Sequence, residues 1–209
     1  MLKSLKKLTV SLAVFALAAL ATSTIAKADS VQLTIPNDPA AIGSGPFANI
    51  TYVLNGNAID VTVTGITPFT LFGSGGGMFG FNVVGDTSGL QITNCVNCTV
   101  PDPLQSQQMS MFGNFEFQVD GTQPPGVPSF SFTVTRNIGF SSASELFENN
   151  AAGYAFAAHI YNPYGPANAQ TGFAGNGGSP VPEPASMILL GTGLVGIAGG
   201  LRRRRKNNR

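Results

Sequence analysis

Residues 129–136 read Ser-Phe-Ser-Phe-Thr-Val-Thr-Arg, with polar and apolar side chains in strict alternation. Because successive side chains of a β-strand point to opposite faces of its sheet, Phe130, Phe132 and Val134 are expected to share one face. Two further stretches place two rings and a valine on one face: Phe79, Phe81 and Val83, and Phe115, Phe117 and Val119. Polar residues fill most of the intervening positions. This pattern is typical of half-buried antiparallel strands.

The same alternation extends through the middle of the chain. It predicts strands over residues 31–35, 48–54, 58–64, 78–84, 90–93, 112–119, 129–136 and 154–161. Asn55-Gly56, between two of these strands, is a hairpin signature. Only residues 142–149 read as a short helical turn, in which Ser144 is expected to be the cap. Short strands separated by Gly- and Pro-rich turns predict an all-β body over residues 29–179, an antiparallel β-sandwich resembling a jelly roll.

The charges divide the chain into a body and two ends. From Asp29 to Glu183 there are ten acids and one cation, Arg136, a net charge of −9, whereas the other ten basic residues lie near the termini. Nucleic-acid backbones are bound by Lys and Arg, so this distribution excludes nucleic acid as a partner of the body. It also argues against a soluble cytosolic enzyme, whose charges would be scattered.

Residues 1–28 have the layout of a secretory signal peptide. Three lysines precede an apolar run over residues 8–20, and small residues follow, ending in Ala26-Lys27-Ala28. We expect this segment to be helical and to be cleaved between Ala28 and Asp29. The alternative is an uncleaved anchor, but the apolar run is short for a membrane span.

Residues 180–209 combine three features at the other end. Val181-Pro182-Glu183-Pro184 precedes an uncharged apolar run over residues 185–201, and a basic tail over 202–209 follows, beginning with Arg202, Arg203, Arg204 and Arg205. A helix over the apolar run would be about 25 Å long, enough for a single transmembrane helix if the arginines snorkel. The arginines should act as a stop-transfer cluster that stays cytoplasmic, leaving the body outside.

This C-terminal arrangement resembles the PEP-CTERM sorting signal of Gram-negative bacteria. The matching residues are Pro182, Glu183 and Pro184, the apolar helix, and the arginine cluster. The resemblance implies a partner, exosortase, which is thought to cut near the Pro-Glu-Pro motif. It also implies a precursor anchored in the inner membrane, from which the body is released to the cell surface or the exopolysaccharide matrix.

The chain has one cysteine pair, Cys95-Val-Asn-Cys98, and one histidine, His159. Export implies an oxidising compartment, so a structural disulfide between the cysteines is expected, with a redox role or a metal site as alternatives. A zinc site would need two further ligands. His159 lies within a predicted strand, where a hydrogen-bonded structural role is expected in preference to a catalytic one.

Other chemistry-bearing residues form no recognised motif. Gly73-Ser-Gly-Gly-Gly77 lacks the Lys-Ser/Thr ending of a phosphate loop and is interpreted as a flexible connection. The acids are spread singly. Calcium is an alternative for four loop aspartates, without the spacing of an EF-hand: Asp38, Asp86, Asp102 and Asp120. No metal and no cofactor are expected.

These observations predict an exported, non-enzymatic protein of the cell surface or extracellular matrix. One alternative is a carbohydrate-binding module for exopolysaccharide, in which Tyr154, Tyr161 and Tyr164 would stack on sugars. Another is a periplasmic domain that stays tethered to the membrane. A hydrolase is disfavoured, because there is one histidine and no nucleophile motif.

Overall fold

The computed structural model describes residues 28–73, 77–167, 169–176 and 181–182. Sixteen elements follow one another along this part of the chain. In chain order they are β1 (Ala28–Pro36), α2 (Pro39–Ile42), β2 (Ala48–Asn55), β3 (Ala58–Gly65), β4 (Thr70–Leu71), β5 (Phe79–Phe81), β6 (Gln91–Val96), β7 (Gln107–Gln108), η1 (Ser110–Phe112), β8 (Asn114–Phe115), β9 (Phe117–Val119), β10 (Ser129–Thr135), η2 (Ala143–Leu146), β11 (Phe156–Tyr161), β12 (Thr171–Asn176) and β13 (Val181–Pro182).

Hydrogen bonds join most of the strands into one 11-stranded sheet. Its order is β6-β10-β3-β2-β1-β12-β11-β5-β9, with β13 added to β1 and β4 added to β11. The pairings within it are antiparallel. The predicted antiparallel all-β body is therefore confirmed.

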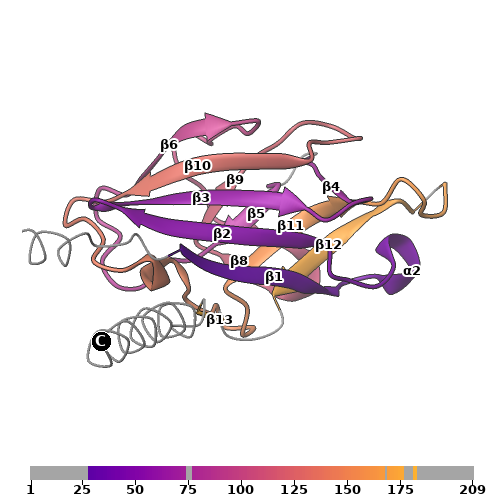
Figure 1. The fold of residues 1–209 in the computed structure, drawn as a ribbon, viewed down its shortest axis with the longest axis horizontal. Coiled ribbons are helices and arrows are strands. Elements are labelled where there is room, and N and C mark those ends of the chain that lie inside the picture. Colours follow the sequence, from indigo (N-terminus) through magenta and orange to yellow (C-terminus); the bar gives the residue numbers. More distant parts are fainter. Residues whose placement is uncertain (1–27, 74–76, 168, 177–180, 183–209) are drawn as a thin grey trace, which may run out of the picture.

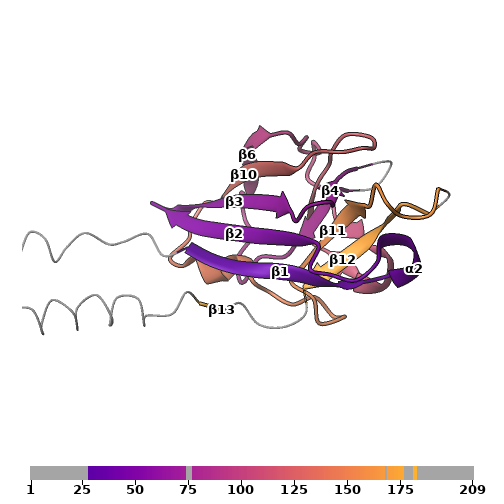
Figure 2. The same ribbon diagram turned by 45° about the vertical axis from the view of Figure 1, so that its right-hand side comes forward.

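The sheet curls so that its two halves face each other (Figure 1). Phenylalanine rings fill much of the core between them. The ring of Phe79 on β5 lies 5.7 Å from that of Phe130 and 6.1 Å from that of Phe132, both on β10 at the other end of the strand order. Phe79 also stacks on Phe156 of β11, at 5.7 Å. The two layers are thus halves of one curled sheet, as the turned view in Figure 2 also shows. The alternating pattern of residues 129–136 supplies one of the facing surfaces.

A smaller apolar cluster lies on the back of the β12-β11-β5-β9 half. It consists of Met109, Phe112, Phe115 and Ala157, all buried. Ala157 occupies the face of β11 opposite to that of Phe156, so this half of the sheet is covered on both sides. The covering segment, residues 101–116, carries the short two-stranded sheet of β7 and β8.

The hairpin predicted at Asn55-Gly56 is present, with Asn55 paired to Ala58. Gly56 has φ +62°, a conformation that an L side chain disfavours. The predicted helical turn is the 3₁₀ segment η2. Its cap was predicted wrongly: Ser142, not Ser144, accepts the capping hydrogen bond, and Glu145 completes a capping box. Helix α2 and strand β12 were not predicted.

The predicted terminal segments lie almost entirely outside the described residues. This applies to the signal peptide up to residue 27, the transmembrane helix over 185–201 and the basic tail over 202–209. Among the residues that are described, no helix has the length and apolarity needed to cross a membrane.

Candidate functional site

The two ends of the described chain meet on β1. The expected signal-cleavage residues, Ala28 and Asp29, are the first two residues of this strand. Strand β13 pairs with it in antiparallel register, with Pro182 opposite Asp29 and Val181 opposite Ser30. The first proline of the sorting motif therefore lies beside the expected start of the mature chain.

Asp29 is buried, on the core-facing side of β1, and pairs with Tyr52 on β2. Burial, and then the nearby Asp29 carboxylate, raise the pKa of the Tyr52 hydroxyl. The other predicted sorting residues lie outside the described part of the chain: Glu183, Pro184, Arg202, Arg203, Arg204 and Arg205.

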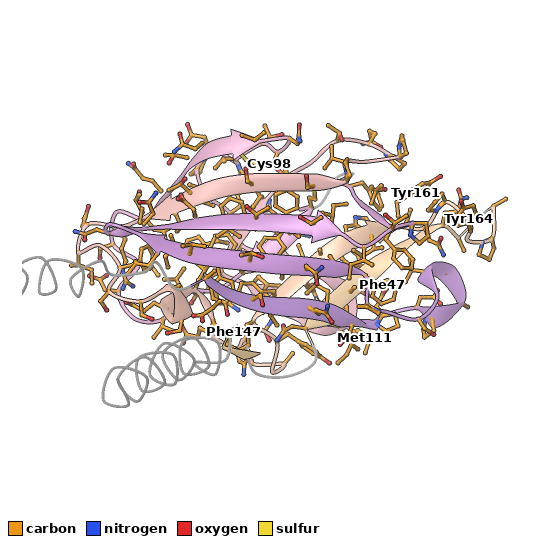
Figure 3. The ribbon with its side chains drawn as sticks, in the orientation of Figure 1. Phe47, Cys98, Met111, Phe147, Tyr161 and Tyr164 are labelled. Atoms are coloured by element: carbon orange, nitrogen blue, oxygen red, sulfur yellow. A yellow bond between two sulfur atoms is a disulfide. The ribbon has the colours of Figure 1, made fainter. Side chains whose placement is uncertain are left out.

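Cys95 and Cys98 are joined by a disulfide in the structure. Cys95 belongs to β6, an edge strand of the sheet, and Cys98 follows its end (Figure 3). Between them Asn97 has φ +58° and donates a side-chain hydrogen bond of 3.1 Å to the carbonyl of Ser129 on β10. The disulfide thus closes a tight loop against the neighbouring strand.

His159 lies between two aromatic rings. Its ring centroid is 3.8 Å from that of Phe72 and 4.2 Å from that of Phe173. Burial lowers the pKa of this imidazole to about 4, because a charged ring would lose hydration that the phenylalanines do not replace. Its Nδ1 atom has no hydrogen-bond partner in the described chain. His159 therefore packs as a neutral aromatic ring, without the predicted side-chain hydrogen bond.

Stability should consequently fall in mild acid. An unfolded histidine titrates near 6.5 and the folded one at about 4, so between these values the unfolded state binds a proton that the folded state does not. Above about pH 6.5 the imidazole is neutral in both states, and its titration does not lower the free energy of unfolding. As the pH falls from 6.5 towards 4, protonation of the unfolded state lowers that free energy. We expect a loss on the order of 2 kcal/mol between pH 7 and pH 4.5, measured by urea unfolding. His159→Phe, which keeps a stacked ring, should abolish most of this loss; an equal loss in the variant would contradict the assignment.

The three tyrosines considered as a sugar platform do not form one surface. Tyr154 precedes β11 and packs edge-on against Phe112, at 4.9 Å between ring centroids. Tyr161 ends β11 and donates a 3.4 Å hydrogen bond to Gln170. Figure 3 shows Tyr161 and Tyr164 near one end of the molecule. Tyr154 lies at the opposite end of the strand from Tyr161, so the expected cluster is reduced to two members.

Several of the single acids have structural roles. Asp38 caps α2 by accepting a 2.9 Å hydrogen bond from the Ala40 amide. The carboxylate of Asp60 accepts one of 2.8 Å from Thr133. Hydrogen bonds from Ser88 lower the pKa of the Asp86 carboxyl. Within the described residues, no group of three or more His, Cys, Asp or Glu side chains is placed to hold a metal ion.

A pocket of about 330 Å³ opens beside the end of β9. Two glycines and five polar side chains line it, the latter being Gln105, Gln107, Gln118, Asp120 and Gln123. Strand β7 supplies Gln107, β9 supplies Gln118, and the turn after β9 supplies Asp120 and Gln123. The lining is therefore rich in side-chain amides and contains no cation.

The polar side chains of this pocket differ in their exposure to solvent. Gln118 is 5% exposed, and its Oε1 accepts no hydrogen bond from any described residue. Asp120 is half-buried, and burial raises the pKa of its carboxyl. Gln105 and Gln123 are exposed at the rim. The structure thus brings together amide groups that the sequence separates by up to 18 positions.

The comparison with protein families identifies the C-terminal segment. The model of the PEP-CTERM protein-sorting motif matches residues 180–205. The chain therefore carries a PEP-CTERM protein-sorting motif at these residues. The motif marks it as an exported protein that is sorted in the cell envelope and processed by exosortase. Comparisons with curated proteins and with solved structures give no match.

The body of this protein has its single cation in a partly buried ion pair. Arg136 pairs with Glu145 and donates to the carbonyls of Val84 and Gly139, at 2.8 Å each. Burial opposes ionisation of Glu145, but hydrogen bonds from Ser141 and Ser142 together with Arg136 lower the pKa of its carboxyl overall. Arg136 is 9% exposed, so the described surface presents little positive charge to a partner.

The amide-lined pocket was not found from the sequence. Gln105, Gln107 and Gln108 are close together in the chain, a weak signal on its own. Gly73, at the start of the segment interpreted as a flexible connection, proves to line the same pocket. The pocket could not be predicted because the sequence does not reveal that residues 101–116 fold over the back of the sheet half that contains β9.

Proposed function

We propose that this protein is an exported, non-enzymatic component of the cell surface or extracellular matrix. In this proposal the signal peptide is removed at Asp29 and the C-terminal helix holds the precursor in the inner membrane. Exosortase then cuts near Pro182, Glu183 and Pro184, and the body joins an exopolysaccharide-associated layer. The observation that carries the proposal is the sorting motif at residues 180–205.

The position of the motif relative to the fold supports release of the body. Strand β12 ends at Asn176, and the short β13 ends at Pro182. A cut at Glu183 or later therefore removes no described strand. The released body would keep its core, its disulfide and its negative charge.

Several contacts support a non-catalytic role. The imidazole of His159 packs between two phenylalanine rings, with burial disfavouring its charged form. Asp38 and Asp60 accept hydrogen bonds that hold the fold, and Glu145 pairs with Arg136. These side chains are therefore engaged in contacts within the fold. A general acid or base needs contact with a substrate.

Mass spectrometry of the protein recovered from its own host tests this proposal. We expect the form in the surface and medium fractions to begin at Asp29 and to end near Pro184. Glu183→Ala should shift most of the protein to the membrane fraction with the C-terminal tail attached. Such retention is expected because the acid of the recognition motif is lost.

The chain contains a matched control in Pro101-Asp102-Pro103, a second acid between two prolines. Asp102 is exposed and lies far from the C-terminal apolar run in sequence, so Asp102→Ala should be processed as the unaltered protein is. If the unaltered protein keeps its tail in the membrane fraction, the protein is a tethered periplasmic domain and release is refuted.

A further inference from the structure

We propose that the start of β1 is the docking site of the protein's own sorting segment, and that this docking holds back the exosortase cut. The segment that docks is β13, Val181–Pro182, whose last residue is the first proline of the Pro-Glu-Pro motif. It pairs with Asp29 and Ser30, whose backbone edge on the side of β13 we call the docking edge. Only the restraint on cutting depends on the proposed function, because the docking is a strand pairing of the sheet.

The docking edge has room for one short strand. On the opposite edge of β1, β2 pairs with residues 28–33. On the edge that β13 shares, β12 pairs only between Leu33 and Pro36. Among the described strands, β13 alone therefore reaches the backbone of Asp29 and Ser30 on this side. The N–H and C=O groups of an open sheet edge favour pairing with an extended segment, and the sorting segment supplies it.

Strand β13 follows the same path along β1 that β12 begins. Asn176, the last residue of β12, lies opposite Leu33, and Val181 lies opposite Ser30. Both strands run antiparallel to β1, so the chain advances towards the start of β1 in both of them. Few residues separate the two pairings, which keeps the entropic cost of closing the second one low.

The antiparallel pairing also places the two processing sites together. Ala28, the first residue of β1, and Pro182, the last residue of β13, lie at the same end of the strand pair. Neighbouring strands of a sheet are about 4.7–4.9 Å apart. The expected signal-cleavage site and the sorting motif are therefore neighbours at one end of the body. In the precursor this end faces the membrane, because the predicted transmembrane run begins at residue 185.

Docking leaves little chain between the body and the membrane. Three peptide units connect Pro182 to Ala185, and they span at most about 11 Å. If β13 leaves the docking edge, nine units connect Asn176 to Ala185 and reach at most about 32 Å. Proteolysis of a folded chain takes place in a locally opened state. We therefore expect the cut to require that β13 first leave β1.

Strand β13 can leave β1 without unfolding of the body. Its ladder with β1 has two residue pairs, and Pro182 has no N–H to donate to it. Segments held by few hydrogen bonds open locally far more often than the whole fold does. The rate of the cut should then follow the population of the opened form. A cut at Glu183 or later leaves β13 on the body, where it docks again.

A disulfide between positions 30 and 181 tests the proposal in the full-length protein, in the membranes of its host. Ser30 and Val181 are directly opposite, and opposed Cα atoms of antiparallel strands lie about 4.5–5.5 Å apart, within the range of a disulfide. We expect Ser30→Cys with Val181→Cys to form this bond, most completely in a Glu183→Ala background that keeps the tail attached.

With Glu183 present, the linked protein should lose its tail at least about tenfold more slowly than the unaltered protein, because the opened form is no longer populated. Mass spectrometry after a pulse of synthesis measures this rate. Reduction of the disulfide in isolated membranes should restore it. The same reductant is given to the unaltered protein, since it also opens the disulfide between Cys95 and Cys98.

The matched control combines Thr34→Cys with Val181→Cys. Thr34 is an exposed residue of β1 that lies four positions from Ser30, about 13 Å along the strand, too far for a disulfide with position 181. This variant should stay unlinked and lose its tail as the unaltered protein does. The single variants Ser30→Cys and Val181→Cys should also be cut normally, which separates the effect of the link from that of either substitution.

Three results would overturn the proposal. Docking is refuted if positions 30 and 181 link no more than positions 34 and 181 do. Restraint of the cut is refuted if the linked protein loses its tail at the unaltered rate. If the unaltered protein never loses its tail, release and its restraint both fail, while the disulfide still decides whether the sorting segment docks on β1.

Discussion

Replacing Arg136 with methionine is expected to lower the free energy of unfolding by about 3–5 kcal/mol. The guanidinium pairs with Glu145, donates to backbone carbonyls, and lies 4.2 Å above the ring of Phe140. Methionine fills part of the volume and makes none of the polar contacts. The carbonyls of Val84, Asp86 and Gly139 would lose their donor, and Glu145 would lose its counter-charge.

Urea unfolding monitored by circular dichroism measures this loss. The double variant Arg136→Met with Glu145→Leu provides the control, since it removes both charges together. Its loss should be smaller than the sum of the two single losses, because no uncompensated carboxylate is left. A cost below about 1 kcal/mol for Arg136→Met would show that the ion pair contributes no more than a surface pair does.

Phe79→Ala is expected to cost a similar amount, about 3–5 kcal/mol. Phe79 is fully buried and stands at the centre of the core, with ring contacts to Phe81, Phe130, Phe132 and Phe156. These partners come from both halves of the curled sheet. Removal of the ring leaves a cavity at the place where the two halves meet, so the loss includes both transfer and cavity contributions.

Phe117→Ala is the matched control for this substitution. Phe117 is half-buried on the edge strand β9, and its ring lies 5.6 Å from that of Phe81. Its truncation should cost clearly less than that of Phe79, since solvent can reach part of the site. Equal losses in urea unfolding would show that the centre of the core is not where the structure places it.

The amino-acid sequence alone was enough to identify the sorting signal and most of the strands. The sorting motif at residues 180–205 is a local pattern, and a local pattern needs no fold to be recognised. Residues 129–136 alternate strictly, and they form β10 with Phe130, Phe132 and Val134 buried. The hairpin at Asn55-Gly56 also has a local cause, because its turn needs the positive φ that Gly56 adopts.

Strand β12 shows where local patterns fail. Its sequence, Thr-Gly-Phe-Ala-Gly-Asn, has two glycines and little apolar alternation. A Cβ atom at Gly175 would lie 2.4 Å from the ring of Phe112, and one at Gly172 would lie 2.8 Å from the side chain of Asn37. The glycines are explained by close approach from segments far away in the chain, which no sequence window contains.

The candidate site also depends on contacts between segments that are distant in the chain. The sequence identified the cysteine pair, and tertiary packing decided how far His159 and Asp120 are buried. The imidazole became a neutral ring between Phe72 and Phe173, because strands far apart in sequence exclude water from it. Sequence alone thus determined where the protein is sent and that its body is β. Tertiary structure decided which polar groups are buried, since burial depends on contacts between segments distant in the chain, and it thereby formed the amide-lined pocket beside β9.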